Sequence, residues 1–211
     1  MKESPTNSSS SFASNTTATL QFRLLGFLPL AFFIAQAVHY WRINELGHML
    51  WMCNIGNLLL AIGFFLNQTR LIRVAVIWMI PGLGVWIFYV ALAWGMFLSS
   101  TLAHVGGIIV GMVALRKVRM DRTAWVYALG WYLVIQLVSY LITPAELNVN
   151  VSHKVASGWE QTFDSYWKFW LVLTAGTAAI LWILGTVLEK LWPARPELES
   201  TFKFRRKPKV G

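Results

Sequence analysis

Most of the chain between residues 24 and 188 is apolar and forms long stretches without Lys, Arg, Asp or Glu. A helix needs about 20 such residues to cross a bilayer core of about 30 Å. The longest stretch, Val74–Leu115, has 42 residues and fits two crossings with a bend near Ala93–Ser100. The other predicted crossings are Leu24–Trp41, Leu46–Thr69, Thr123–Ala145 and Phe169–Leu188. Because backbone groups in lipid must bond internally and no alternating strand pattern appears, we predict an all-α bundle of six transmembrane helices.

The two ends of the chain differ from this apolar centre. Residues 1–20 are rich in Ser, Thr and Asn without apolar periodicity, which predicts a disordered tail and no signal peptide. Residues 21–192 form the predicted membrane domain, and residues 193–211 form a short basic tail. Within the membrane domain, Pro81, Gly82 and Gly84 are expected to break the third helix. No internal repeat is evident, so an inverted-repeat transporter gains no support.

Composition agrees with a membrane protein and excludes several other classes. The 211 residues are 56% hydrophobic and 13% charged, with a single cysteine. A soluble domain carries roughly 25% charged residues, so this chain has about half the usual supply. Disordered, collagen-like and disulfide-rich secreted proteins are therefore excluded, and the lone cysteine excludes an internal disulfide.

The net charge of +9 is explained by where the basic residues lie. Six crossings place both termini on one side, and that side receives 15 of the 18 Lys and Arg residues, all except Arg42, Lys154 and Lys168. Positive loops favour the cytoplasm, which predicts cytoplasmic N and C termini in a multi-pass protein of the cell membrane. Membrane lipids, rather than nucleic acid, are the partners that these charges indicate. Association with a second copy stays open.

All four histidines and the only cysteine fall in the predicted outer half of the membrane domain. Cys53 lies seven residues after the predicted helix start at Leu46, and His104 lies seven residues after Phe97. At about 1.5 Å per residue, both residues are expected roughly 10 Å below the outer helix ends. Ionisable side chains inside a membrane are costly and usually face the bundle interior, which makes this pair a candidate site.

The candidate chemistry is that of a Cys–His pair. A thiolate is a strong nucleophile, and a neighbouring imidazole can accept the thiol proton and later protonate a leaving group. Asn54 and Asn57 follow on the same helix and are candidates for orienting the base or an oxyanion. In the alternative, purely structural interpretation, Cys53 is a small buried apolar residue and the His104 ring is bonded to a neighbouring carbonyl.

Four further outer residues are candidates for substrate binding or orientation. They are His48, Asn148, Asn150 and His153. The two asparagines follow Pro144 and could cover the site, or could belong to an ordinary loop whose side chains bond its own backbone. His153 could contact a head group or simply be solvated.

The segment from Trp51 to His153, about half of the chain, resembles the YwaF-like (transmembrane protein 164-like) integral membrane family. The features that carry the resemblance are Cys53 with Asn54, the His–x–Gly of His104 and Gly106, and the outer turn Asn148–Asn150. The resemblance implies six helices, Cys53 as nucleophile, His104 as base, and acyl transfer or acyl hydrolysis on lipids. The family is similar in plan to androgen-induced membrane hydrolases, which pair a threonine with a histidine. This chain has Trp51 and Met52 where a histidine is expected, and His48 lies five positions before the cysteine.

Two other classes of function stay open at this point. One is a non-catalytic membrane scaffold or a small-solute transporter, although the predicted spans lack the Asp, Glu, Lys or Arg that ion-coupled transport uses. The other is a metal or haem protein that uses the outer histidines, although no fixed ligand spacing such as His-x-x-x-His appears. The sequence therefore predicts no cofactor and no metal ligands.

Overall fold

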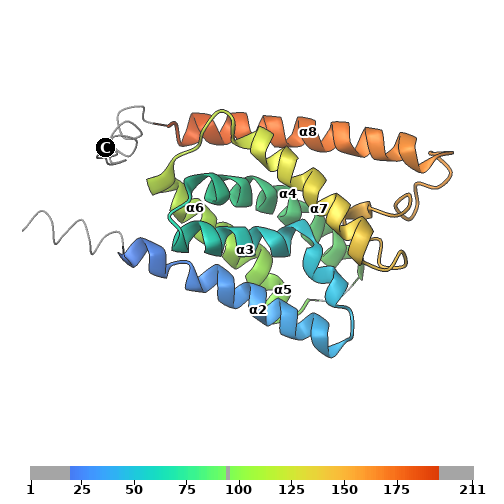
Figure 1. Cartoon of the computed structure of the whole chain (residues 1–211), viewed down its shortest axis with the longest axis horizontal. Helices are drawn as coiled ribbons and strands as arrows, with labels where there is room; N and C mark the ends of the chain where they lie inside the picture. The colour runs from blue at the N-terminus through green and yellow to red at the C-terminus, as the bar shows by residue number, and fades with distance from the viewer. Residues whose placement is uncertain (1–19, 94–95, 195–211) are drawn as a thin grey trace, which may run out of the picture.

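The computed structural model describes residues 20–93 and 96–194, and its regular elements in these ranges are all helical (Figure 1). In chain order they are α2 (Phe27–Arg42), η1 (Leu46–Leu50), α3 (Met52–Phe65), α4 (Thr69–Ala93), α5 (Leu98–Thr101), η2 (Leu102–Gly106), α6 (Gly107–Val118), α7 (Ala124–Ile142), η3 (Val149–Val151) and α8 (Tyr166–Leu191). Apart from Leu20, Pro193 and Ala194, the predicted tails 1–20 and 193–211 lie outside the described residues.

Five helices in the described part of the chain are long and apolar enough to cross a membrane. They are Leu20–Arg42, Thr69–Leu92, Leu98–Val118, Ala124–Ile142 and Tyr166–Leu191. The sixth apolar helix, α3, has 14 residues. At about 1.5 Å per residue it is about 21 Å long, shorter than a bilayer core. The prediction of an all-α, multi-pass architecture is confirmed at this level.

The prediction of a continuous second helix over Leu46–Thr69 is wrong. Residues Leu46–Leu50 form a 3₁₀ turn, Trp51 is extended, and α3 begins only at Met52. At its other end the helix stops before Asn67, whose φ of 52° is left-handed. Apolar composition hides this break, because the residues of the turn are as hydrophobic as those of a helix.

The third and fourth predicted crossings are separated as expected, but the expected break at Pro81 is absent. Helix α4 ends at Ala93 and α5 begins at Leu98, so the bend falls within the predicted interval. Pro81 lies inside α4, which continues through it for another three turns. Membrane helices tolerate proline because other groups satisfy the freed carbonyl, which explains why the residue alone does not end the helix.

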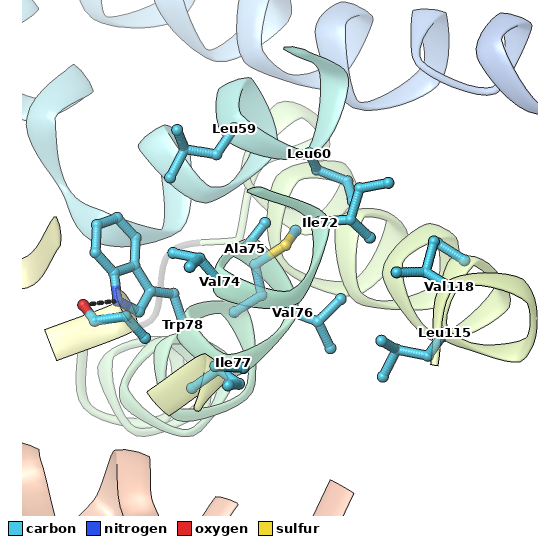
Figure 2. Packing of buried hydrophobic residues seen from close by; sticks show 14 of the residues in the cluster. Leu59, Leu60, Ile72, Val74, Ala75, Val76, Ile77, Trp78, Leu115 and Val118 are labelled. Carbon is cyan, nitrogen blue, oxygen red and sulfur yellow. Dashed lines mark hydrogen bonds between the residues drawn. The ribbon is translucent and has the colours of Figure 1, made fainter. Parts of the chain in front are cut away.

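Helix α4 is the centre of the bundle. It packs against α3, α6, α7 and α8, and every residue from Ile72 to Met79 is buried (Figure 2). Within this core, the Trp78 indole donates to the carbonyl of Ala128 on α7 at 3.0 Å. The approach of α3 depends on Gly63, because a Cβ there would lie 2.7 Å from Cγ1 of Ile72. Apart from Arg73, this stretch of α4 has no polar face, which is typical of a helix surrounded by other helices.

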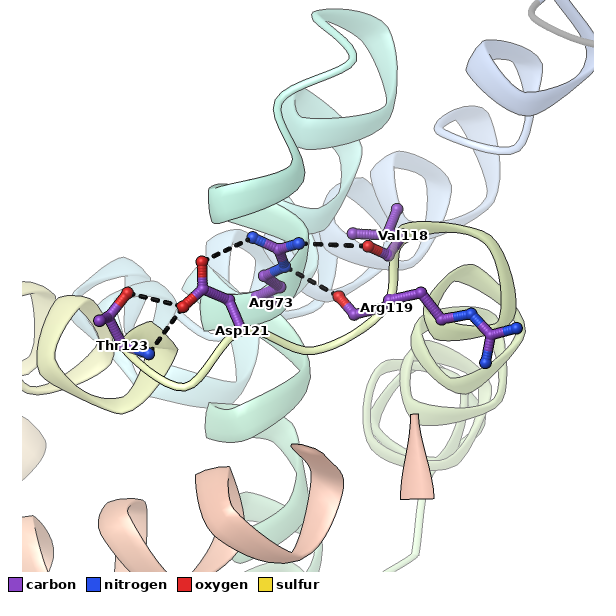
Figure 3. A network of polar contacts seen from close by, with 5 residues as sticks. All are labelled: Arg73, Val118, Arg119, Asp121 and Thr123. Atoms are coloured by element: carbon purple, nitrogen blue, oxygen red, sulfur yellow. Dashed lines mark hydrogen bonds and ion pairs between the residues drawn. The ribbon is translucent and has the colours of Figure 1, made fainter. Parts of the chain in front are cut away.

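One end of the bundle is closed by a buried arginine. Arg73 donates to the carbonyls of Arg119 at 2.8 Å and Val118 at 3.3 Å, and pairs with Asp121 at 3.3 Å (Figure 3). Asp121 also accepts from the backbone N–H and hydroxyl of Thr123. Partial burial alone would raise the pKa of Asp121, but the Thr123 hydrogen bonds and the nearby arginine charges hold it below its ordinary value. This network joins α4 to the junction between α6 and α7.

Candidate functional site

Cys53 lies at the opposite end of the bundle, in the first turn of α3. It is half-buried and faces α4 at Gly82, where a Cβ would lie 3.4 Å from the Cys53 Cβ. Because α3 begins at Met52, Cys53 is not two helical turns deep, and that part of the depth prediction is wrong.

The ring of His104 is held by two contacts. The residue is 8% exposed and lies in η2, a π-helical turn inside the fourth crossing. Its Nδ1 lies 2.8 Å from the carbonyl oxygen of Ser100, and its ring stacks on Trp86 at a centroid distance of 5.2 Å. Since a carbonyl only accepts, Nδ1 must carry the proton, which leaves the lone pair of a neutral imidazole on Nε2. Trp86 is fixed in turn by its indole N–H, which donates to the Ser100 hydroxyl at 2.8 Å.

Cys53 and His104 contact the same face of α4, one helical turn apart. Gly82, beside Cys53, and Trp86, beside His104, are related by i and i+4. The structure thus brings both residues to one side of α4, which the sequence does not predict. It records no hydrogen bond between the thiol and the imidazole within the described residues.

Asn57 connects the backbones that carry the two reactive residues. Its Nδ2 donates to the carbonyl of Cys53 at 3.0 Å and to that of Ala103, the residue before His104, at 2.9 Å. The side chain is fully buried and lies so close to Gly107 that a Cβ there would be 2.5 Å from Asn57 Oδ1. A side chain inserted into a helical hydrogen-bond ladder is a recognised cause of local distortion, and the π turn occurs where Asn57 bonds.

Asn54 and His48 stabilise the turn before α3. Asn54 Nδ2 donates to the carbonyl of His48 at 3.0 Å. The His48 ring accepts the indole N–H of Trp51 on Nδ1 at 2.9 Å, which places its proton on Nε2, 3.2 Å from a carboxylate oxygen of Glu45. Both candidate residues therefore have structural partners, and their predicted roles in orienting a substrate stay predictions.

Asn150 reaches the start of α3 from almost 100 residues away in sequence. Its Oδ1 accepts from the N–H of Met52 at 3.3 Å, and its Nδ2 donates to the carbonyl of Leu50 at 2.8 Å and the hydroxyl of Ser139 at 2.9 Å. Asn150 thus caps α3 immediately before Cys53, with a left-handed φ of 53° that asparagine tolerates.

Asn148 and His153 organise their own loop. Asn148 Oδ1 accepts the backbone N–H groups of His153 and Lys154, which is the local bonding that an ordinary loop would show. His153 lies 3.2 Å from the hydroxyl of Thr143 and tilts against the ring of Tyr140. A role for this loop in binding substrate stays a prediction.

Several residues around the pair are not among those predicted from the sequence. Trp86 and Ser100 position His104, and Tyr40 on α2 lies near the Cys53 thiol. Gln36, one turn before Tyr40 on α2, is 1% exposed, and its Oε1 has no hydrogen-bond partner. A glutamine within an apolar crossing is the signal that could have identified this side of the interior.

The metal and haem alternative gains no support from the arrangement of the histidines. His39 stacks on Phe97 at 4.1 Å, and His48, His104 and His153 each have the separate partners given above. Over residues 20–93 and 96–194, no group of three or more His, Cys, Asp or Glu side chains is close enough to hold a metal ion.

No protein-family model, curated protein or solved structure matches the chain. The resemblance to the YwaF-like family therefore stays a prediction from the motifs around Cys53 and His104.

Proposed function

We propose that this multi-pass membrane protein is an acyltransferase or acyl hydrolase that acts on lipid esters, with Cys53 as nucleophile and His104 as general base. The observation that carries the proposal is the fixed tautomer of His104. A base whose Nδ1–H is held by a carbonyl and whose Nε2 is left to accept a proton has the form found in nucleophile–base pairs. The Asn57 bridge to the backbones of Cys53 and Ala103 supports it.

The proposed reaction has two balanced steps. The Cys53 thiol gives its proton to His104 Nε2, and the thiolate attacks the ester carbonyl, so that a C–S bond forms and the ester C–O bond breaks. The leaving alkoxide takes the proton from His104. Water or an acceptor hydroxyl then gives a proton to His104 and attacks the thioester, which releases the acyl group and restores the thiol. Catalytic hydrogen bonds are often long in the free enzyme and shorten when substrate binds. Because Cys53 and His104 contact α4 one helical turn apart, the reaction requires their side chains to move toward each other.

We also propose that both termini face the cytoplasm and that the reactive pair lies toward the opposite leaflet. Contacts among the described residues support this orientation. The basic junctions meet at one end, where Arg23 bonds to the carbonyl of Phe65 and Arg73 bonds to the junction of α6 and α7. Such clustering is the pattern that the positive-inside preference produces.

A non-catalytic membrane scaffold is the second candidate function. Three observations favour it: His104 is bonded to the neighbouring carbonyl of Ser100, the thiol of Cys53 does not bond to His104 in the described residues, and Asn57 Nδ2 joins α3 to the fourth crossing while its buried Oδ1 has no partner. In this case the polar residues serve only to hold α3 against the fourth crossing.

The two candidates are separated by turnover of labelled phospholipid in proteoliposomes. The catalytic proposal predicts release or transfer of the labelled acyl chain, lost in Cys53→Ala and reduced by at least a hundredfold in His104→Ala, in line with the usual contribution of a general base. His39→Ala is the matched control, because His39 stacks on Phe97 at the same end of the bundle and has no role in the proposed reaction. Equal turnover in all variants, or none in the wild type across ester lipids, favours the scaffold.

A further inference from the structure

The two ends of the bundle carry opposite charge. The end closed by Arg73 has eight Lys and Arg residues against two acids, Asp121 and Glu189, within the described chain. The other end has three basic residues against four acids, again counting described residues only. Asp121 is already paired with Arg73, so the carboxylates at the first end do not balance its positive charge.

Three exposed cations lie on the segments that meet at one junction of this basic end. Arg70 lies in the first turn of α4 with its guanidinium 5.1 Å from the centre of the Tyr127 ring on α7. Arg122 follows Asp121 directly, and Lys190 lies in the last turn of α8. The segment after Lys190 is joined to the same junction, because the N–H of Met120 donates to the carbonyl of Trp192 at 2.7 Å.

The two arginines of α4, the buried Arg73 and the exposed Arg70, make different contacts. Arg73 is 6% exposed in its side chain and directs three nitrogen atoms at the junction. Arg119 contributes its carbonyl to this network while its guanidinium extends away from it (Figure 3). The direct partner of Asp121 is thus Arg73, while the exposed guanidinium of Arg70 lies near the same carboxylate and over the ring of Tyr127 on α7.

An apolar stripe continues from Arg70 along the outside of α7. Tyr127, Trp131 and Val134 follow one another at i, i+4 and i+7 and are 42%, 38% and 49% exposed. The cations Arg70, Arg122 and Lys190 lie at the end of this exposed aromatic and aliphatic stripe. A lipid fits this arrangement, with its phosphate at the cations and its acyl chain along the helix. A soluble polyanion would bind the cations but would leave Tyr127, Trp131 and Val134 uncovered.

We propose that Arg70, Arg122 and Lys190 form a site for the head group of an anionic phospholipid, with the acyl chain lying along α7. The proposal does not depend on the catalytic role of Cys53. Each cation near an anionic membrane surface contributes roughly a fivefold gain in affinity. Loss of all three is therefore expected to weaken binding by up to about a hundredfold.

The test is native mass spectrometry of the full-length protein released from zwitterionic detergent with phosphatidylglycerol or phosphatidylcholine. We expect the wild type to retain phosphatidylglycerol in preference, Arg70→Gln to weaken this roughly fivefold, and the triple variant R70Q/R122Q/K190Q to abolish the preference. The triple variant R42Q/K154Q/K168Q removes the same charge from the other end and should bind as the wild type does. If the triple variant R70Q/R122Q/K190Q does not fold, the retention of phosphatidylglycerol by Arg70→Gln tests the proposal.

Three results would overturn the proposal. The first is equal retention of phosphatidylglycerol by the wild type and by Arg70→Gln. The second is an equal loss in the control variant from the opposite end, which would mean that overall charge rather than this site binds the lipid. The third is displacement of the lipid by an equal concentration of inorganic phosphate, which would identify a phosphate site without lipid recognition.

Discussion

Replacement of Asn57 should loosen the contact between α3 and the fourth crossing. Asn57→Ala removes two buried hydrogen bonds, to the carbonyls of Cys53 and Ala103. Each such bond contributes about 0.6 to 1.5 kcal/mol in a protein or membrane interior. The removed amide also leaves a small cavity at a position that is fully buried. Together these losses predict a decrease of about 2 to 3 kcal/mol in the free energy of unfolding.

Asn57→Asp separates the loss of the two hydrogen bonds from the loss of side-chain volume. The carboxylate has almost the shape of the amide, but it cannot donate to either carbonyl and brings a charge to a buried position. We therefore expect a larger loss than for alanine, of more than about 3 kcal/mol. If only the volume of the side chain matters, the aspartate variant should instead be the more stable of the two.

Unfolding in mixed micelles of increasing SDS content, followed by the fluorescence of the 12 tryptophans, measures these differences. Gln161→Ala is the matched control, because this exposed loop residue lies far along the chain from the α3 contacts. The reasoning is refuted if Asn57→Ala and Asn57→Asp both unfold within about 0.5 kcal/mol of that control, the usual range for surface changes.

Three further predictions concern packing, capping and pH. Gly63→Ala should lower the free energy of unfolding by about 1 to 3 kcal/mol, because its Cβ would meet Ile72 at 2.7 Å; an unchanged SDS midpoint would contradict this. Asn150→Ala should cost about 1 to 3 kcal/mol by uncapping α3, and faster amide hydrogen exchange at its first turn should accompany the loss. Because the pKa of Asp121 is lowered in the folded state, its stabilising contribution is present above its ordinary pKa and lost as pH falls through the lower folded value. Thermal unfolding of the wild type should therefore weaken over that acidic interval more than that of Asp121→Asn, and parallel curves would refute the role of the charge.

The sequence predicts the crossings well because the requirement is local. A run of apolar residues without charges must lie in lipid or in a core, whichever neighbours it meets, and the break between α4 and α5 follows from length alone. The break in the helix before Met52 cannot be predicted from the length of the apolar run. It is stabilised by Asn54, which bonds to His48, and by Asn150, which bonds from the turn that follows α7, and neither contact has a signal in the hydrophobic pattern.

The candidate site shows the same division between local and tertiary information. The shared helix face of Cys53 and Asn57 follows from their spacing, and the common end of the histidines follows from the topology. The carbonyl of Ser100 that fixes the His104 tautomer lies one helical turn earlier in the same helical run, whereas the stack of His104 on Trp86 depends on the bend between α4 and α5. The sequence does not specify the angle of this bend.

The central claim, that Cys53 and His104 act together on a lipid ester, is tested most directly by intact-protein mass spectrometry after a brief reaction with an excess of ester lipid. The account predicts an added acyl mass on Cys53 that hydroxylamine removes, absent in Cys53→Ala and formed much more slowly in His104→Ala. An unmodified thiol at every time point, or an adduct that forms equally fast without His104, would contradict it.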